Sequence, residues 1–419
     1  MADYHPLIEI IVASIVLAFT FGYIAKRLKL PIVLGYLVAG VLIGPHTPGF
    51  VGDPHLAAQL AEIGVILLMF GVGLHFSPSD LYRLRKVAIP GAVVQIASAI
   101  LLGTAIAVYR GFTVIQGLVF SIPLSVASTV VLLRALNGYY GRKRLLDTQV
   151  GKISVAWLVV EDIAMVLAIV LLPVLADLAA ENKESAISVG TVAFDIGITF
   201  VKIACFAALM FFIGRKILPP VLVTILKTKS RELASLVILS IALGFAFAAY
   251  KLFDASFALG AFLAGLVLNE TEIGAKTVQN HLPLKDIFAV LFFVSVGMLF
   301  DPTVVFKHPW MVTAALVIVL FGKSIAAYGI SRAFAQTTTT SLFVAASLAQ
   351  IGEFSFIFAG MARQFELLPA TLYDVILACA LISIAVNPFM FKLAEMLSPD
   401  KPKASPPTNH HGPIENHYV

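Results

Sequence analysis

Two adjacent carboxylates, Glu161 and Asp162, lie inside a long apolar run that extends from about residue 150 to 176. An ionisable residue near the centre of a membrane helix costs about 2.5–3.5 kcal/mol on insertion scales, so such residues are rare and commonly mark ion or proton paths. Removal from water disfavours the charged carboxylate, which allows a proton and a cation to compete for one group. The pair therefore predicts a site at which protons and cations compete.

Glu161 and Asp162 cannot serve one small site as equals, because neighbouring residues on a helix point about 100° apart. We expect one carboxylate to face the ion path and the other to pair with a cation on a facing helix. Lys323, deep in another apolar run, is the natural partner of Glu161. A purely structural Glu161–Lys323 ion pair is an equally good interpretation. Asp162 would then have no comparable partner, so it is the expected ion- and proton-binding residue.

Two further apolar runs each contain a position where a membrane helix can unwind, Pro123 in one and Gly352 in the other. Interrupted helices in corresponding halves point to an ion site, because half-helix ends and freed carbonyls can coordinate ions. An alternative is that the hydroxyls there only allow close helix packing. The candidate secondary ligands beside the interruptions are Ser125, Ser128 and Thr129 in the first run, and Gln350 and Glu353 in the second.

The elements that must position these residues are membrane helices. The chain has 419 residues, of which 59% are hydrophobic and 13% charged, against about 25% charged in ordinary globular proteins. Its apolar runs are about 18–25 residues long, the length that crosses a bilayer as a helix. The sequence thus predicts an all-α integral membrane protein with about 13 transmembrane helices, at roughly 7–25, 31–48, 57–76, 88–109, 114–135, 150–176, 188–213, 232–250, 255–270, 284–301, 309–331, 339–361 and 367–395.

The basic residues alternate between rich and poor connectors along this series of helices. The positive-inside rule then predicts an external N-terminus and a cytoplasmic C-terminus, in a multi-pass protein of the bacterial inner membrane. The net charge of +5 does not indicate nucleic-acid binding, because the positive charges are dispersed among connectors. The connectors predicted to be external hold only Arg110, Lys183, Lys251, Lys307 and Arg363.

The sequence also repeats itself. Leu34-Gly35 with Ala39-Gly40 matches Leu259-Gly260 with Ala264-Gly265, about 225 residues downstream. A second pair, around Gly73 and Gly297, has nearly the same offset. The offset corresponds to an odd number of helices, so the two copies are expected to be inverted across the membrane, a signature of secondary transporters.

These segments together resemble the monovalent cation:proton antiporter-2 family, which includes Kef-type potassium efflux systems and bacterial sodium/proton exchangers. The resemblance extends over about residues 7–395, and its telling segments are 34–45, 62–74, 159–162, 257–268, 291–298 and 349–354. It implies the sodium/proton antiporter-like fold, with two broken helices that cross, and a homodimer. It also implies a scaffold of about 1–87 and 232–306, a core of about 88–180 and 307–397, and a linker helix at 188–213.

In this family Asp162 falls at the position of the ion- and proton-binding aspartate. Glu161 falls at the variable position before it, and Lys323 at a position where some relatives carry a lysine that pairs with that acid. The Glu-Asp pair differs from the Asp-Asp and Gln-Asp pairs of relatives, which leaves potassium versus sodium and the stoichiometry open. The residues from 398 to 419 are expected to be a disordered polar tail, so a regulatory domain of the Kef kind would be separate or missing.

The function expected from these features is exchange of potassium or sodium for protons by alternating access. One alternative is a ligand-gated potassium channel, since some Kef-type efflux has been described as channel-like. Another is a sensor that keeps the fold without transport. An enzyme is disfavoured because the sequence lacks metal-ligand spacings and a nucleophile with its base. No cofactor is expected, because no phosphate-binding loop or dinucleotide fingerprint is present.

Overall fold

The computed structural model describes residues 6–28, 30–48, 52–75, 78–136, 145–146, 148–181, 201, 205–206, 208–253, 257–269 and 283–399. Over these residues every regular element is helical. Each expected span except 188–213 coincides with a described helix, or with two or three consecutive ones. Most of 188–213 and nearly all of the tail expected at 398–419 lie outside the described residues.

The first half of the chain contains helices α1 to α7, and one π-helical segment, η1, follows. Helix α4 is much longer than the expected span 88–109, because it begins in the preceding connector. The helices are α1 (Pro6–Arg27), α2 (Ile32–Ile43), α3 (Pro54–His75), α4 (Pro78–Tyr109), α5 (Val114–Ser125), α6 (Thr129–Leu136), α7 (Gln149–Glu181) and η1 (Met210–Gly214).

The second half adds helices of the same kind, together with α9 and α14, which the hydropathy pattern does not predict. Apolar length alone identifies five candidate spans among the described helices, and seven further helical stretches of 10–17 residues are also apolar. The helices are α9 (Arg215–Lys227), α10 (Arg231–Phe253), α11 (Phe257–Asn269), α13 (Pro283–Met298), α14 (Val304–Lys307), α15 (Pro309–Val317), η2 (Ile318–Gly322), α16 (Lys323–Ala333), α17 (Thr338–Leu348), α18 (Glu353–Gln364) and α19 (Ala370–Leu397).

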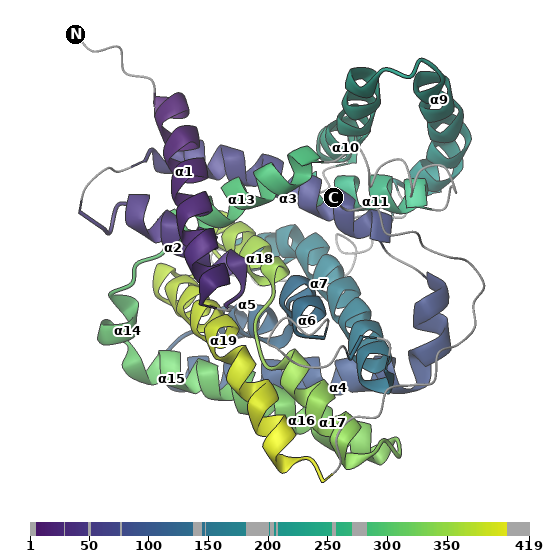
Figure 1. Cartoon of the computed structure of the whole chain (residues 1–419). Coiled ribbons are helices and arrows are strands. Elements are labelled where there is room, and N and C mark those ends of the chain that lie inside the picture. The colour runs from purple at the N-terminus through teal and green to yellow at the C-terminus, as the bar shows by residue number, and fades with distance from the viewer. Residues whose placement is uncertain are drawn as a thin grey trace.

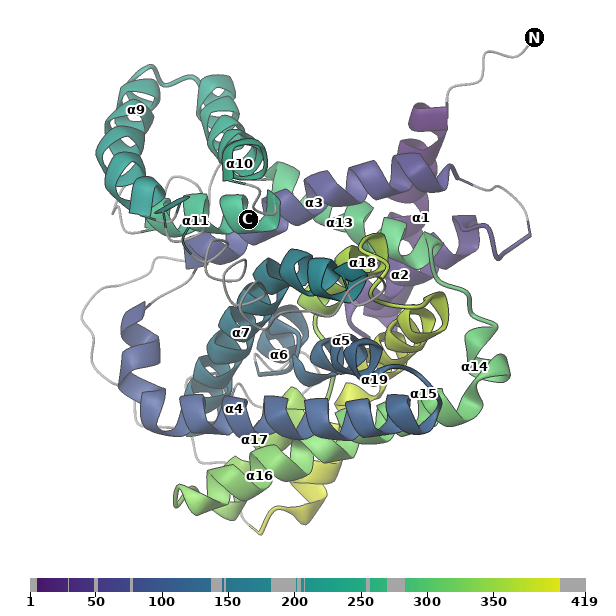
Figure 2. The same ribbon diagram turned by 180° about the vertical axis from the view of Figure 1, so that it is seen from behind.

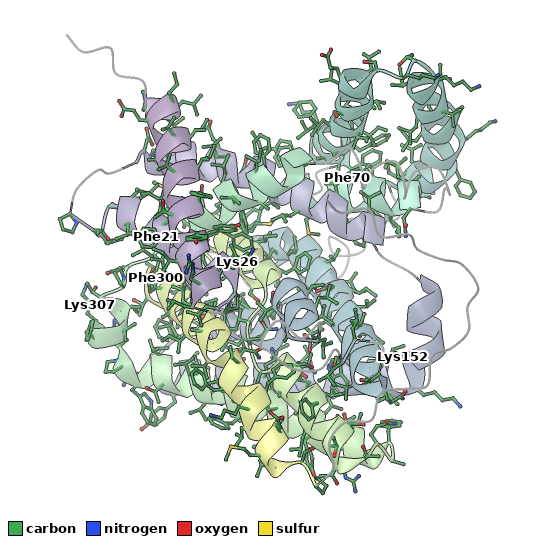
Figure 3. The ribbon with its side chains drawn as sticks, viewed as in Figure 1. Phe21, Lys26, Phe70, Lys152, Phe300 and Lys307 are labelled. Carbon is green, nitrogen blue, oxygen red and sulfur yellow. The ribbon has the colours of Figure 1, made fainter. Side chains whose placement is uncertain are left out.

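Helices α1, α2, α3, α11 and α13 pack together in one part of the structure, with α9 and α10 projecting beside them (Figure 1). The repeat glycines permit this packing. A Cβ on Gly40 would lie 2.0 Å from the carbonyl oxygen of Val294, and one on Gly297 would lie 2.2 Å from that of Leu37. Backbones this close require residues without side chains. Phe70 on α3 is among the large apolar side chains buried here (Figure 3).

The other helices surround α5, α6 and α7. Helix α4 runs along them and contacts α5, α7 and α16, while α17 packs on α16 and α19 (Figure 2). Trp157 on α7 and Phe391 on α19 are fully buried in the apolar core of this part. The candidate site residues all belong to this second group of helices.

Two expected spans are interrupted, as their sequences predict. The first interruption, however, does not lie at the residue that the sequence indicates. The chain leaves the helical conformation at Val126–Ser128, between α5 and α6, whereas Pro123 stays inside α5. The expectation that the helix unwinds at Pro123 is therefore wrong. The helix ends where side chains from other helices replace its backbone partners. The second interruption lies between α17 and α18 and includes Gly352, as expected.

Candidate ion-binding site

The two interrupted helices touch at their extended segments. The amide of Gly352 donates to the carbonyl oxygen of Val126 at 3.0 Å. A Cβ on Gly352 would lie 2.5 Å from the carbonyl oxygen of Ala127, so this crossing requires glycine at position 352. The interruptions free backbone groups that a continuous helix would pair, and each freed group buried in a membrane protein needs another partner.

The carboxylate of Glu161 supplies one of these partners. Its Oε2 accepts a hydrogen bond from the Ala127 amide at 2.7 Å. That amide would otherwise donate to the carbonyl of Pro123, four residues earlier, and Ser355 Oγ donates to this carbonyl instead at 2.7 Å. The other oxygen of Glu161 accepts from the side-chain amide of Gln95 on α4. Glu161 is fully buried and thus caps the interruption of the α5–α6 span.

Gln350 caps the same interruption from the second half of the chain. Its Oε1 accepts from the Ser128 amide at 2.9 Å, and its Nε2 donates to the Ser128 carbonyl at 3.2 Å. The buried side chain of Gln350 therefore pairs with the Ser128 backbone as a neighbouring strand would. This arrangement makes Gln350 part of the structure that holds the crossing together.

Asp162 is in a different setting from its neighbour. Its side chain is only partly buried, and Thr129 Oγ1 donates to its Oδ2 at 3.2 Å. Thr129 is the first residue of α6, and the start of a helix favours a nearby anion. The structure thus separates the two carboxylates, with Glu161 fixed inside the crossing and Asp162 at the edge of it.

Lys323 is fully buried at the start of α16, directly after the π-helical segment η2. Its Nζ donates to the carbonyl oxygen of Gln350 at 3.1 Å, and its charge also interacts with that of Glu161. Both residues belong to the described part of the chain, and the Lys323 ammonium and the Glu161 carboxylate do not approach within 4.0 Å of each other. The expected Glu161–Lys323 partnership is therefore electrostatic, with the carbonyl of Gln350 as the hydrogen-bonded partner of the lysine.

The remaining candidate ligands have local roles in this structure. Ser125 Oγ donates to the carbonyl of Ile122 at 2.7 Å, and Ser128 Oγ accepts from the Val131 amide at 3.2 Å. Both hydroxyls therefore serve the ends of α5 and α6. Glu353 begins α18, but its side chain lies outside the described residues.

Several polar residues at the crossing were not anticipated from the sequence. Each is a neutral side chain inside an apolar helix, so the rule that buried charges mark functional sites does not identify it. A single amide or hydroxyl within a membrane span is the signal that would have found them. They are Gln95, Ser355, Ser383, whose Oγ accepts from the Ile351 amide at 3.2 Å, and Asn387, whose Nδ2 donates to the Ala346 carbonyl at 3.0 Å.

Two interrupted helices that cross beside one buried and one partly exposed carboxylate, in a chain with an inverted repeat, define a secondary ion transporter of the antiporter fold. The chain belongs to the sodium/hydrogen exchanger transmembrane family, which matches residues 15–394. The solved structure of the sodium proton antiporter MjNhaP1 from Methanocaldococcus jannaschii is similar, with a TM-score of 0.67 and 14% sequence identity, over 93% of this chain and 98% of that one. At this identity the likeness concerns the fold.

Curated relatives are similar over most of this chain. The putative cation/proton antiporter YbaL of Escherichia coli is 51% identical over 390 residues, which are 93% of this chain and 69% of that protein. K(+) efflux antiporter 4 of Arabidopsis thaliana is 31% identical over 389 residues, 92% of this chain and 64% of that protein. The glutathione-regulated potassium-efflux system protein KefC of Cronobacter sakazakii is 29% identical over 399 residues, 94% and 61%.

Proposed function

We propose that this chain exchanges a monovalent cation, potassium or sodium, for protons across a membrane, and that Asp162 is the residue for which the two compete. The observation that carries the assignment is the contrast between the two carboxylates. Glu161 is committed to the Ala127 amide and to Gln95, whereas Asp162 is partly exposed and is held by the Thr129 hydroxyl. A group that must release and rebind ions has to remain accessible.

The chemistry follows from the charge of Asp162. As a carboxylate it binds one cation, with Thr129 Oγ1 beside it as an oxygen ligand. A proton neutralises the same oxygens and displaces the cation. Oxygen ligands suit both sodium and potassium, and the choice between them depends on cavity size and the number of ligands. The relatives named for potassium efflux and the neighbour named for sodium support testing both ions.

Glu161 and Lys323 have a supporting role in this proposal. The two charges offset each other inside the crossing, and Lys323 also satisfies the freed carbonyl of Gln350. A buried charge without an opposite charge nearby is costly. The pair therefore stabilises the crossing beside Asp162. Separation of the two charges during the transport cycle would couple protonation to the movement of the helices.

Transport by alternating access requires one group of helices to move against another. We assign the moving core to about 88–180 and 307–397, the scaffold to about 1–87 and 232–306, and the linker helix to 188–213, in a homodimer of the bacterial inner membrane. The separate packing of α1–α3, α11 and α13 supports this division. The alternation of basic-rich and basic-poor connectors supports a topology with the N-terminus outside and the C-terminus in the cytoplasm.

The proposal is tested with purified protein in liposomes that contain a pH-sensitive dye. Addition of potassium or sodium should move protons in the opposite direction, and Asp162→Asn should abolish this movement because the amide cannot bind or release the proton. Uphill proton movement driven by a cation gradient separates an exchanger from a channel, which only dissipates gradients. Cation flux that runs downhill without protons would establish the channel alternative, and retained exchange in Asp162→Asn would remove Asp162 from the site.

A further inference from the structure

Gln95 is a buried amide on α4 that hydrogen-bonds both to the end of α5 and to the Glu161 carboxylate. Its side chain has no solvent exposure. The Nε2 group donates to the carbonyl oxygen of Ser125, the last residue of α5, at 3.2 Å, and also to the Glu161 carboxylate on α7. One side chain thus joins α4 to the end of α5 and to the middle of α7.

Both acceptors need this donor, for separate reasons. In a continuous helix the Ser125 carbonyl would accept from the amide of Thr129, and the interruption removes that bond. The carbonyl at the end of a helix also carries partial negative charge, and the Glu161 carboxylate adds a full one nearby. An NH₂ group between them donates one hydrogen to each acceptor. It offsets their repulsion without introducing a positive charge.

In the other interrupted helix, the freed carbonyl at the end of the first half-helix also accepts from a side chain, but that side chain is a lysine. There Lys323 on α16 donates to the carbonyl of Gln350, which follows α17, and its charge interacts with Glu161. Helices α4 and α16 contact each other. Glu161 therefore accepts from a neutral donor in the first half of the chain and interacts electrostatically with a cation from the second.

We propose that Gln95 is a positioning residue of the ion site, which fixes Glu161 against the end of α5 so that Asp162, the next residue, is presented to the cation beside Thr129. The assignment rests on the function proposed for Asp162. Gln95 acts on Asp162 through Glu161, because the two carboxylates share the same turn of α7. A shift of the Glu161 side chain would rotate or translate that turn.

Any pH dependence of this arrangement belongs to a small set of groups. Glu161 is faced by Lys323 from α16 and has Asp162 as its neighbour on α7. The buried thiol of Cys379 on α19 lies near Lys323. A test of Gln95 must therefore separate its effect on Glu161 from direct effects on the other groups, which a double-mutant cycle does.

The experiment measures cation binding rather than transport. The melting temperature of the detergent-purified protein is followed against potassium or sodium concentration, with choline as the reference salt, across a pH series. A bound cation raises the melting temperature by mass action. Gln95→Met keeps the side-chain length and removes the donor, and Ser98→Ala is the matched control, because the Ser98 hydroxyl on the same helix only donates to the Gln95 backbone carbonyl at 2.8 Å.

We expect Gln95→Met to raise the cation concentration for half-maximal stabilisation about tenfold, the factor expected for a lost hydrogen bond to a charged group. Ser98→Ala should leave it unchanged. In a Glu161→Gln background, Gln95→Met should have little further effect. Equal effects of Gln95→Met in both backgrounds, or an unchanged cation dependence with a lower melting temperature, would overturn the assignment.

A second variant and the response of the unmodified protein complete the test. If Gln95→Met does not fold, Gln95→Glu keeps the shape and can donate only when protonated, so it should bind the cation with a steeper pH dependence than the unmodified protein. A melting temperature of the unmodified protein that responds to neither cation also overturns the proposal, because there would be no cation site to position. Failure of proton exchange in liposomes, with cation binding still sensitive to Gln95, would count against antiport alone.

Discussion

Gln350 and Ser128 form a reciprocal pair of hydrogen bonds although they are 222 residues apart in the chain. This separation is close to the offset of about 225 residues between the two sequence repeats, so the two residues occupy corresponding positions in the two halves. The interrupted helices therefore meet near the axis that relates the repeats. The amide of one half completes the backbone of the other, and Glu161 and Asp162, both on α7, lie beside this crossing.

Gln350→Met should destabilise the protein by about 1–3 kcal/mol, because the buried Ser128 amide loses its acceptor. The Gln350 carbonyl remains available to Lys323, so the change isolates the side chain. Thermal unfolding in detergent measures the loss, and Gln364→Met, at an exposed glutamine on α18, is the control for the substitution itself. Equal melting temperatures for the two variants would show that the reciprocal bonds contribute little to the crossing.

Gly352→Ala should abolish exchange and lower the yield of folded protein, because the new Cβ would lie 2.5 Å from the carbonyl oxygen of Ala127. Backbone cannot yield as a flexible side chain does, so the crossing itself must open. The matched control is Gly360→Ala, inside α18, the helix that Gly352 precedes, where the added Cβ would meet nothing within 4 Å beyond the nearby backbone of its own helix. That variant should be as stable as the unmodified protein or more stable by up to about 1 kcal/mol. An active, well-folded Gly352→Ala variant would show that the two interrupted helices do not need this close backbone contact.

The fold was largely predictable because the bilayer constrains sequences strongly. A span must be apolar over about 20 residues, so hydropathy located the helices, and the repeat glycines around Gly40 and Gly297 located close packing. The cost of buried charge singled out Glu161, Asp162 and Lys323 without any structure. These are rules of solvation, and they apply residue by residue along the chain.

The details of the site depended on contacts that solvation rules do not encode. Pro123 was expected to mark the first interruption, yet the chain unwinds three residues later, where Glu161 and Gln350 can accept the Ala127 and Ser128 amides. Gln95 was missed because a neutral amide has no meaning in a hydropathy pattern until its acceptors are known. Partners from distant helices, rather than local propensity, decide where a membrane helix breaks.

Lys323→Ala should change the pH profile of exchange more than the yield of folded protein. The variant removes the positive charge that interacts with Glu161 and the donor to the Gln350 carbonyl, so protonation at the site is altered. Exchange in liposomes across a pH series and the yield after size-exclusion chromatography are the two measurements. Ser324→Ala, which removes a neighbouring hydroxyl bonded to the Ala345 carbonyl, is the control. A parallel fall of yield and activity would make the lysine a structural residue only.

Asp301, in the connector between α13 and α14, should contribute stability that depends on pH. The Thr303 hydroxyl donates to its carboxylate at 2.6 Å, the Thr303 amide at 2.9 Å and Lys307 Nζ at 3.3 Å, and these bonds hold the pKa of Asp301 below its ordinary value. Because the pKa is lower in the folded protein than in the unfolded chain, the contribution is complete above the unfolded value of about 3.9 and is lost as the pH falls through the folded value.

The Thr303 hydroxyl is the largest cause of this shift, so Thr303→Val should remove much of the pH dependence, whereas Thr303→Ser should keep it. The expected difference in stability near neutral pH is below about 1 kcal/mol, because the ion pair with Lys307 is exposed to solvent. Melting temperatures of the two variants should therefore differ near neutral pH and converge as the pH falls below about 3.9. A gap between Thr303→Val and Thr303→Ser that stays constant down to strongly acidic pH would mean that packing of the methyl groups, and not the charge of Asp301, distinguishes them.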